Sequence, residues 1–224
     1  MKNVTNKNLS NNNLKLLFFC IICLIAFILV LLFRGRFATI DLDISLRFPT
    51  IQSISLTYAA LAVSFVFDTY ILLVITLVIS AFLFVRNYRG EGLLLLGAMG
   101  GITVLVSTIK NLVHSPRPSN GLITNSGFSF PSGHATGSMV FCGLITYFAW
   151  QHWKNLKSRA LAVTFCVAAS SVVGFDRVYL NVHWFSDVLG GTMLGLSWLT
   201  FSILIFQLLK TNITEKLKFK PKSK

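Results

Sequence analysis

Three short segments in the second half of the chain carry side chains that could do chemistry. They read KNLVHSPRP at residues 110–118, PSGH at residues 131–134 and DRVYLNVHWFSD at residues 176–187. Three cations stand among them, and a phosphate group suits such a set because guanidinium groups bind it bidentately and an ammonium adds a point charge. The segments therefore predict a phosphate site. The cations are Lys110, Arg117 and Arg177.

The PSGH segment stands immediately before an apolar run, where we expect a helix to begin. The first backbone N–H groups of a helix are unpaired, and together with the helix dipole they favour an anion. Gly133 lets the backbone approach a ligand closely, and Ser132 could cap the helix or donate to a phosphate oxygen. We therefore expect Ser132 and Gly133 to form the floor of the phosphate pocket, with His134 at its rim.

His183 and Asp187 are four residues apart, a spacing that places them on one face of a helix. A carboxylate bound to one ring nitrogen fixes the tautomer and leaves the other nitrogen as a nucleophile. His134 could then protonate the leaving oxygen as a general acid. Together the residues predict hydrolysis of a phosphate ester through a phosphohistidine, without a metal ion or another cofactor. Taken alone, the His183–Asp187 pair could also be structural.

The composition of the chain predicts an integral membrane protein. Of its 224 residues 54% are hydrophobic and only 12% are charged, whereas soluble domains are about a quarter charged. The apolar residues fall in runs of about 20, the length of a bilayer-spanning helix. The net charge of +13 fits membrane topology better than nucleic-acid binding. We therefore expect an all-α helical bundle whose partner is the lipid bilayer.

We expect one domain of six membrane spans over residues 14–209, with the site at one membrane face. The polar segment at residues 1–13 is expected to be disordered, and the basic tail at residues 210–224 to lie in the cytoplasm. Residues 34–49 read as a polar connection. Residues 50–67 read as a semi-apolar helix, either interfacial or partly inserted. The expected spans are residues 14–33, 69–85, 92–113, 132–150, 160–175 and 184–209.

The positive charges indicate an orientation for this layout. With both termini in the cytoplasm, the cytoplasmic segments hold 14 of the 20 Lys and Arg residues, as the positive-inside rule expects. The three polar segments then lie at the non-cytoplasmic face. Three of the six positive residues on that face belong to the predicted phosphate site. The six are Arg34, Arg36, Arg47, Lys110, Arg117 and Arg177.

The three segments resemble, in order and spacing, the motifs of the type 2 phosphatidic acid phosphatase superfamily. The family pattern is Lys, six residues, Arg-Pro; then Pro-Ser-Gly-His; then Ser-Arg, five residues, His, three residues, Asp. This sequence matches the pattern from residue 110 to residue 187, except that Asp176 replaces the usual Ser. The carboxylate of Asp176 could draw the guanidinium of Arg177 away and repel substrate, or it could pair with Arg177 and orient it.

The resemblance implies a role for each matching residue. His183 would be the nucleophile, Asp187 its partner and His134 the general acid. The family hydrolyses lipid phosphates, and its compact microbial members commonly act on phosphatidylglycerol phosphate or a polyprenyl diphosphate such as undecaprenyl diphosphate. Phosphatidic acid is a further candidate substrate. The residues implied to hold the phosphate are Lys110, Arg117, Ser132, Gly133 and Arg177.

Two other functions fit the same residues. A non-catalytic lipid-phosphate binder or transporter would need the cations but not the His183–Asp187 pair. A lipid phosphotransferase would pass the phosphoryl group from His183 to an acceptor other than water. The sequence selects neither one lipid substrate nor an oligomeric state.

Overall fold

The computed structural model describes residues 10–218, and side chains up to residue 210. Residues 1–9 of the segment expected to be disordered and residues 219–224 of the basic tail lie outside this part. Helices make up the described chain, and no strand occurs within it. In chain order the elements are α1 (Asn11–Leu32), α2 (Arg34–Arg47), η1 (Phe48–Ile51), α3 (Ile54–Val66), α4 (Thr69–Val85), α5 (Arg89–Val113), α6 (Gly133–His152), α7 (Leu156–Tyr179) and α8 (Phe185–Lys218).

The first helix begins three residues earlier than the sequence pattern predicts. Residues 11–13 belong to α1, although we expected the span to start at residue 14. The cause is a polar cap: the hydroxyl of Ser10 accepts a hydrogen bond from the backbone N–H of Asn13, 3.3 Å away. Such a cap satisfies an otherwise unpaired N–H at a helix start. Polar residues therefore extend the helix at its N-terminal end.

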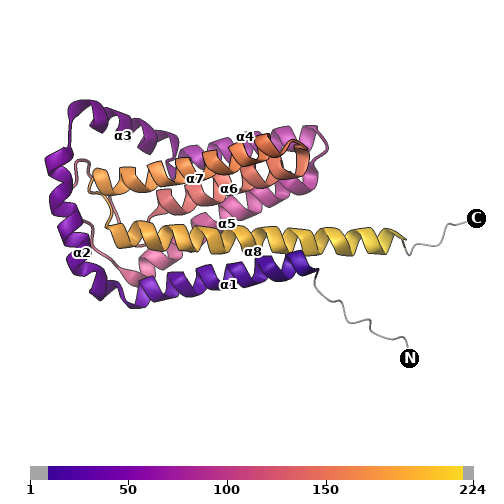
Figure 1. The fold of residues 1–224 in the computed structure, drawn as a ribbon, viewed down its shortest axis with the longest axis horizontal. Helices are drawn as coiled ribbons and strands as arrows, with labels where there is room; N and C mark the ends of the chain where they lie inside the picture. The colour runs from indigo at the N-terminus through magenta and orange to yellow at the C-terminus, as the bar shows by residue number, and fades with distance from the viewer. Residues whose placement is uncertain (1–9, 219–224) are drawn as a thin grey trace, which may run out of the picture.

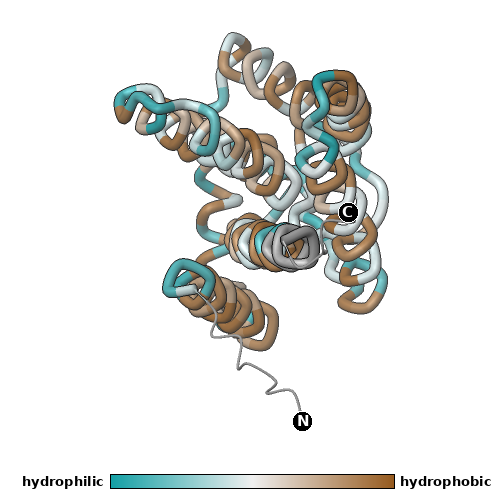
Figure 2. Tube along the Cα trace, turned by 90° about the vertical axis from the view of Figure 1, so that its right-hand side faces the viewer, coloured by the Kyte–Doolittle hydropathy of each residue, from teal (hydrophilic) through white to brown (hydrophobic). Residues whose placement is uncertain are grey.

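The long helices run side by side, so that connections gather at two opposite ends (Figure 1). The turns between α4 and α5 and between α6 and α7 lie at one end, together with the start of α1. The connection between α5 and α6 and the turn between α7 and α8 lie at the other. We call the latter the motif end, because all three polar segments of the sequence reach it. In Figure 2, viewed from the far end, hydrophobic residues dominate the helices and hydrophilic residues gather at the connections.

The helices support the predicted integral membrane bundle. Within the described residues, α1, α5, α7 and residues 185–210 of α8 are long and apolar enough to cross a membrane. Helices α3 and α4 meet this test together, as a pair bent by 48°. Helix α6 is less apolar, but it packs against α5, α7 and α8 inside the bundle. The all-α membrane bundle is confirmed, whereas the crossing of the membrane by α6, and with it the count of six spans, stays a prediction.

The polar connection expected at residues 34–49 is largely a helix, α2, which lies across the motif end (Figure 1). The sequence pattern hides it because its apolar residues do not form one continuous stripe. Its buried residues, Asp41 and Ser45, are polar. Asp41 accepts hydrogen bonds from the backbone N–H of Ser186, at 2.9 Å, and from its hydroxyl, at 2.6 Å. Helix α2 is therefore fixed to the start of α8 by hydrogen bonds rather than by apolar packing.

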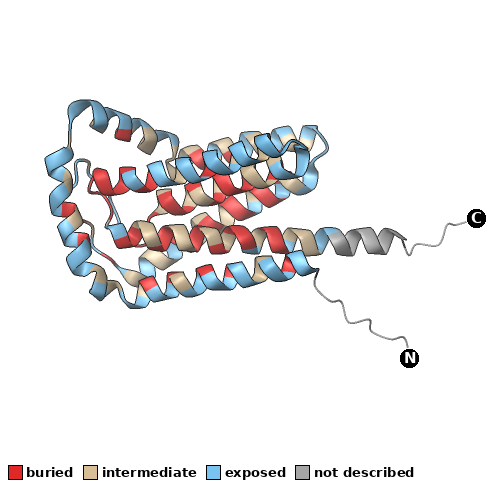
Figure 3. Ribbon diagram, viewed as in Figure 1, coloured by how far each residue is buried: buried red, intermediate tan, exposed pale blue. Residues whose placement is uncertain are grey.

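Close packing of α6 on α8 sets the position of the PSGH segment. Buried residues follow α8 along most of its described length (Figure 3). A Cβ atom added to Gly191 would lie 2.8 Å from the carbonyl oxygen of Ser132 and 2.9 Å from the hydroxyl of Thr136. Real Cβ contacts are longer than this, so the absent side chain permits the approach. Gly191 thus lets α8 lie directly beside the first turn of α6.

Candidate active site

The three polar segments meet at the motif end around a cavity of about 320 Å³. Lys110 lies in the last turn of α5 and Arg177 in the last turn of α7. The PSGH segment begins α6, and His183 stands just before α8. Six of the eight predicted site residues line the cavity. They are Lys110, Arg117, Gly133, His134, Arg177 and His183.

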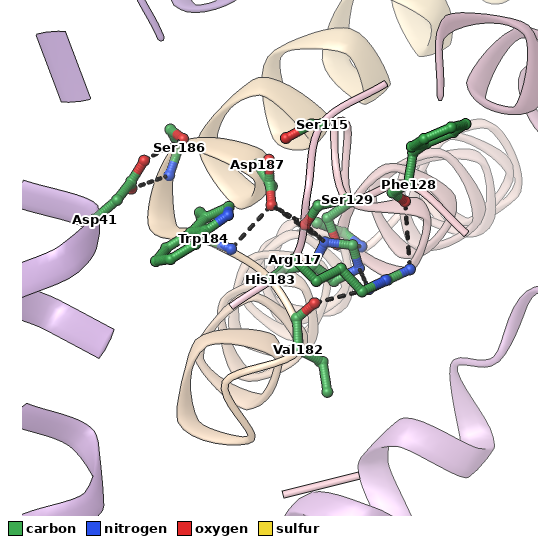
Figure 4. Close-up of polar contacts among 12 residues, drawn as sticks. Asp41, Ser115, Arg117, Phe128, Ser129, Val182, His183, Trp184, Ser186 and Asp187 are labelled. Carbon is green, nitrogen blue, oxygen red and sulfur yellow. Dashed lines mark hydrogen bonds and ion pairs between the residues drawn. The ribbon is translucent and has the colours of Figure 1, made fainter. Parts of the chain in front are cut away.

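His183 is contacted at both ring nitrogens (Figure 4). Its Nδ1 lies 3.4 Å from Oδ2 of Asp187 and 3.2 Å from the hydroxyl of Ser129. Its Nε2 lies 3.2 Å from Nη1 of Arg117, which also lines the cavity. An imidazole protonated at Nδ1 fits these partners, because Nδ1–H donates to the carboxylate and Nε2 accepts from the guanidinium. The lone pair of Nε2 is then directed at Arg117 beside the cavity.

Asp187 is fully buried in the first turn of α8. Its Oδ2 accepts hydrogen bonds from the backbone N–H of Trp184, at 2.9 Å, and from the hydroxyl of Ser129. A carboxylate at a helix N-terminus is stabilised by the unpaired N–H groups and the dipole there. The start of α8 therefore both holds Asp187 and presents its Oδ2 to His183.

Burial lowers the pKa of His183 to about 4, although its hydrogen bond to Asp187 and the charge of that carboxylate act in the opposite direction. The side chain is only 4% exposed, and burial disfavours the charged imidazolium. The neutral form therefore predominates at pH 7. A neutral ring with an unshared pair on Nε2 is the state in which histidine attacks an electrophile.

Lys110 and Arg117 hold the connection between α5 and α6 over the cavity. Lys110 Nζ donates to the carbonyl oxygen of Phe128 at 2.7 Å. Arg117 donates to the carbonyl oxygen of Val182 at 2.7 Å and to that of Gly127 at 3.1 Å. Burial lowers the pKa of Arg117, but a guanidinium starts so high that it stays charged at pH 7. Two positive groups thus stand beside His183.

The PSGH segment forms the expected helix start. The hydroxyl of Ser132 accepts a hydrogen bond from the backbone N–H of Ala135 at 3.4 Å, so this side chain caps α6. Its backbone N–H donates to the carbonyl oxygen of Asp187 at 3.1 Å, which joins the starts of α6 and α8. Ser132 is fully buried, and Gly133 beside it lines the cavity. Binding of phosphate by these two residues stays a prediction.

His134 approaches the bend between α3 and α4. Its Nε2 lies 3.2 Å from the carbonyl oxygen of Ser64 and 4.0 Å from Oδ2 of Asp68. Asp68 also caps α4, because its Oδ1 accepts from the backbone N–H of Tyr70 at 2.8 Å. His134 therefore borders the cavity across from His183, with a carboxylate that can stabilise a protonated ring.

In the structure Asp176 pairs with Arg177, whereas the effect of this pair on substrate binding stays a prediction. Oδ2 of Asp176 accepts hydrogen bonds from Nε of Arg177, at 2.8 Å, and from Nη2 of the same guanidinium. The hydroxyl of Ser64 donates to both carboxylate oxygens, the shorter distance being 3.2 Å. Both charged side chains are 2% exposed, and Arg177 lines the cavity. Asp176 thus pairs with Arg177 and fixes its orientation at the cavity wall.

Two residues of this network were not predicted from the sequence. Ser129 joins Asp187 to His183, and Ser64 joins Asp176 to His134. Ser129 carried a weak signal, since it stands two residues before the PSGH segment in an otherwise aromatic stretch. Ser64 lies in α3 among apolar residues and carried none. In the part of the chain that the structure describes, no three His, Cys, Asp or Glu side chains are placed to hold a metal ion.

Comparison with known proteins finds a matching family and several relatives. Residues 91–210 match the model of the PAP2 superfamily. Phosphatidylglycerophosphatase B of Bacillus subtilis is 35% identical over 149 residues, which cover 66% of this chain and 70% of that protein. An undecaprenyl-diphosphatase of Sulfolobus acidocaldarius is 35% identical over 74 residues, or 33% of this chain and 31% of that protein.

A solved structure resembles the whole fold. It is the crystal structure of the first transmembrane PAP2 type phosphatidylglycerolphosphate phosphatase from Bacillus subtilis. The TM-score is 0.76 with 25% sequence identity, over 91% of this chain and 98% of that one. The family match spans more than half of this chain and includes every predicted site residue. The chain therefore belongs to the PAP2 superfamily and is an integral membrane phosphatase.

Proposed function

We propose that this protein hydrolyses a lipid phosphate through a phosphohistidine on Nε2 of His183. The observation that carries the proposal is the position of that ring, with Asp187 at Nδ1 and Arg117 at Nε2 on the border of the cavity. A protein that only binds a lipid phosphate needs the cations but has no use for an oriented, neutral imidazole.

In the first step, the lone pair of Nε2 of His183 attacks phosphorus, and the bond from phosphorus to the leaving oxygen breaks. His134 gives its proton to that oxygen, so that the lipid product leaves as an alcohol or, from a diphosphate, as a monophosphate. Lys110, Arg117 and Arg177 stabilise the negative charge on the transferred group. The carboxylate of Asp187 stabilises the positive charge that develops on the imidazole.

In the second step, water attacks phosphorus and the bond from phosphorus to nitrogen breaks. His134, now neutral, accepts a proton from the water, and inorganic phosphate leaves. His183 returns to its neutral form with the proton still on Nδ1. The cycle consumes one water and needs no metal ion, because Lys and Arg side chains supply the positive charge around the phosphate.

The relatives suggest which lipid to test first. The Bacillus subtilis protein that aligns with two thirds of this chain is named a phosphatidylglycerophosphatase, and the Sulfolobus acidocaldarius protein an undecaprenyl-diphosphatase. Phosphatidylglycerol phosphate is therefore the first candidate substrate, undecaprenyl diphosphate the second and phosphatidic acid the third. We further propose that hydrolysis takes place at the non-cytoplasmic face, on the basis of the positive-inside rule.

The proposal is tested by measuring phosphate release from these three lipids with the purified protein in detergent. We expect release from at least one lipid, unaffected by EDTA and inhibited by vanadate, which can mimic the five-coordinate phosphoryl state. Loss of activity in EDTA that a divalent ion restores would contradict the mechanism. Transfer of the phosphoryl group to an added alcohol in preference to water would point to a phosphotransferase instead.

A further inference from the structure

Arg34 is a cation of the motif end that no motif accounts for. It is the first residue of α2, directly after the bend from α1. Its guanidinium lies over the ring of Phe130, 4.6 Å from the centroid, and its Nη2 donates to the hydroxyl of Ser115. The same Nη2 lies 3.8 Å from Oδ1 of Asp187. Arg34 thus contacts the connection that carries two of the motifs and the acidic partner of His183.

One oxygen of the Asp187 carboxylate, Oδ1, has no hydrogen-bond partner among the described residues. The carboxylate is fully buried, and its Oδ2 already has partners in Ser129 and Trp184. Its Oδ1 accepts no hydrogen bond from any side chain or backbone group in the described residues. A buried carboxylate is costly unless a counter-charge lies close. Among the described Lys and Arg side chains, Arg34 is the one within 4.0 Å of it.

The position of Arg34 is determined by α2 as a whole. Asp41 is seven residues further on, so it lies on nearly the same face of the helix two turns away. Asp41 accepts hydrogen bonds from the backbone N–H and the hydroxyl of Ser186, the residue before Asp187 (Figure 4). Ser45, one turn beyond, donates to the side chain of Asn120 at 3.0 Å. One face of α2 is therefore fixed to α8 and to the α5–α6 connection, and Arg34 is held at the end of that face.

We propose that Arg34 is a positioning residue for catalysis, acting through Asp187, and this rests on the proposed function. Its positive charge holds Oδ1 of Asp187, and Oδ2 then stays directed at Nδ1 of His183. The tautomer with a free Nε2 is thereby favoured, and so is the positive imidazole that forms when phosphorus is attacked. Arg34 is not among the residues that line the cavity, and it does not bind the substrate.

A double-mutant cycle with Asp187 tests the coupling. Arg34→Gln should lower kcat by about 10- to 100-fold with little change in KM, because residues in one charge network are energetically coupled. In the Asp187→Asn background, the same change should cost less than about threefold, since the charge on which Arg34 acts is gone. Arg34→Lys should recover part of the loss. Arg36→Gln, an exposed neighbour on the same helix, is the matched control and should leave kcat unchanged.

Two further measurements separate this role from a structural one and from failure of the proposed function. Arg34→Gln should keep a melting temperature in detergent close to that of the wild type, so that unfolding does not explain the fall in kcat. The affinity for vanadate, measured from its thermal shift, should be non-additive in the same cycle. If the wild type turns over normally but the losses of the two variants are strictly additive in kcat and in vanadate affinity, the role of Arg34 is overturned and the proposed function stands. A wild-type protein that neither hydrolyses lipid phosphates nor binds vanadate would overturn the proposed function and this role with it.

Discussion

The motif end and the far end of the bundle carry charged residues in opposite environments. At the motif end, Asp176, Arg177 and Asp187 are between 0% and 2% exposed. At the far end, Nε2 of His152 lies 3.0 Å from Oε1 of Glu91, and the side chain of His152 is 41% exposed. Lys157 in the first turn of α7 is exposed as well. Charged side chains are thus buried around the cavity at the motif end, whereas His152 and Lys157 at the far end are exposed. The turns at the far end are largely exposed in Figure 3.

This difference separates charges that cost little where they are from charges that need a chemical reason for their position. Burial of a charge costs several kcal/mol unless partners compensate for it, whereas exposed ion pairs are worth about 0–1 kcal/mol. Charges at the far end therefore cost little and can serve the orientation of the protein in the membrane. The buried charges at the motif end are kept only within a network around the cavity, whereas the Asp43–Arg47 pair on α2 is exposed. Four predictions test this contrast, ordered by decreasing size of effect.

His183→Ala should lower phosphate release by at least about 1,000-fold, because it removes the proposed nucleophile. His152→Ala at the far end is the matched control and should retain activity. Both variants should be compared by melting temperature in detergent, so that loss of folding is separated from loss of chemistry. Substantial turnover by a folded His183→Ala protein would contradict the assignment of the nucleophile.

Cysteines introduced at the two ends should react from opposite sides of the membrane. Ser119→Cys, in the α5–α6 connection, should be labelled by a membrane-impermeant thiol reagent in intact cells. Lys157→Cys should be labelled only after the membrane is opened. Both positions are exposed, and the four native cysteines are buried, although a Cys-free background is the proper control. The reverse pattern would place hydrolysis at the cytoplasmic face.

Asp176→Ser should destabilise the protein by about 3 kcal/mol, because it leaves the buried guanidinium of Arg177 without its carboxylate. For a chain of this size that corresponds to a fall in melting temperature of roughly 6–12 °C. Inorganic phosphate in the cavity should reduce the difference in melting temperature between the wild type and Asp176→Ser, because it offers Arg177 another anion. An unchanged melting temperature without phosphate would show that the pair is not important for stability. Ser64→Ala, which removes one hydroxyl donor to Asp176, should cost only about 1 kcal/mol.

Glu91→Gln at the far end should have the smallest effect. It removes the charge that faces the half-exposed ring of His152, and such a pair is worth less than about 1 kcal/mol. Activity should stay within about twofold of the wild type, because the pair lies at the opposite end from the cavity. A large loss of turnover in a stable Glu91→Gln protein would mean that the two ends are coupled, and the contrast drawn above would fail.

The class of the protein and most of its reactive groups could be predicted from the sequence. Runs of apolar residues predicted the membrane bundle, because a bilayer leaves few alternatives to long helices. Local spacing was also sufficient for the cap at Ser132 and for the approach of His183 to Asp187. Both depend on residues no more than four apart. Ser132 caps α6, whereas His183 stands in the turn before α8, so it meets Asp187 without sharing a helix with it. The match to a family pattern then assigned roles to the remaining cations.

The support of the site depends on contacts between segments far apart in the sequence. Asp41 and Ser186 are 145 residues apart, and Ser64 and Asp176 are 112 apart, so no local pattern could pair them. No local pattern could pair Arg34 with Asp187 either. From the sequence it was one of three positive residues of the predicted non-cytoplasmic face that lie outside the motifs, and the packing of α2 places it beside Asp187. The orientation of Asp176 toward Arg177 was also undecided, because two adjacent side chains can turn either way. Contacts between distant segments depend on how the helices pack, and packing is a property of the whole chain.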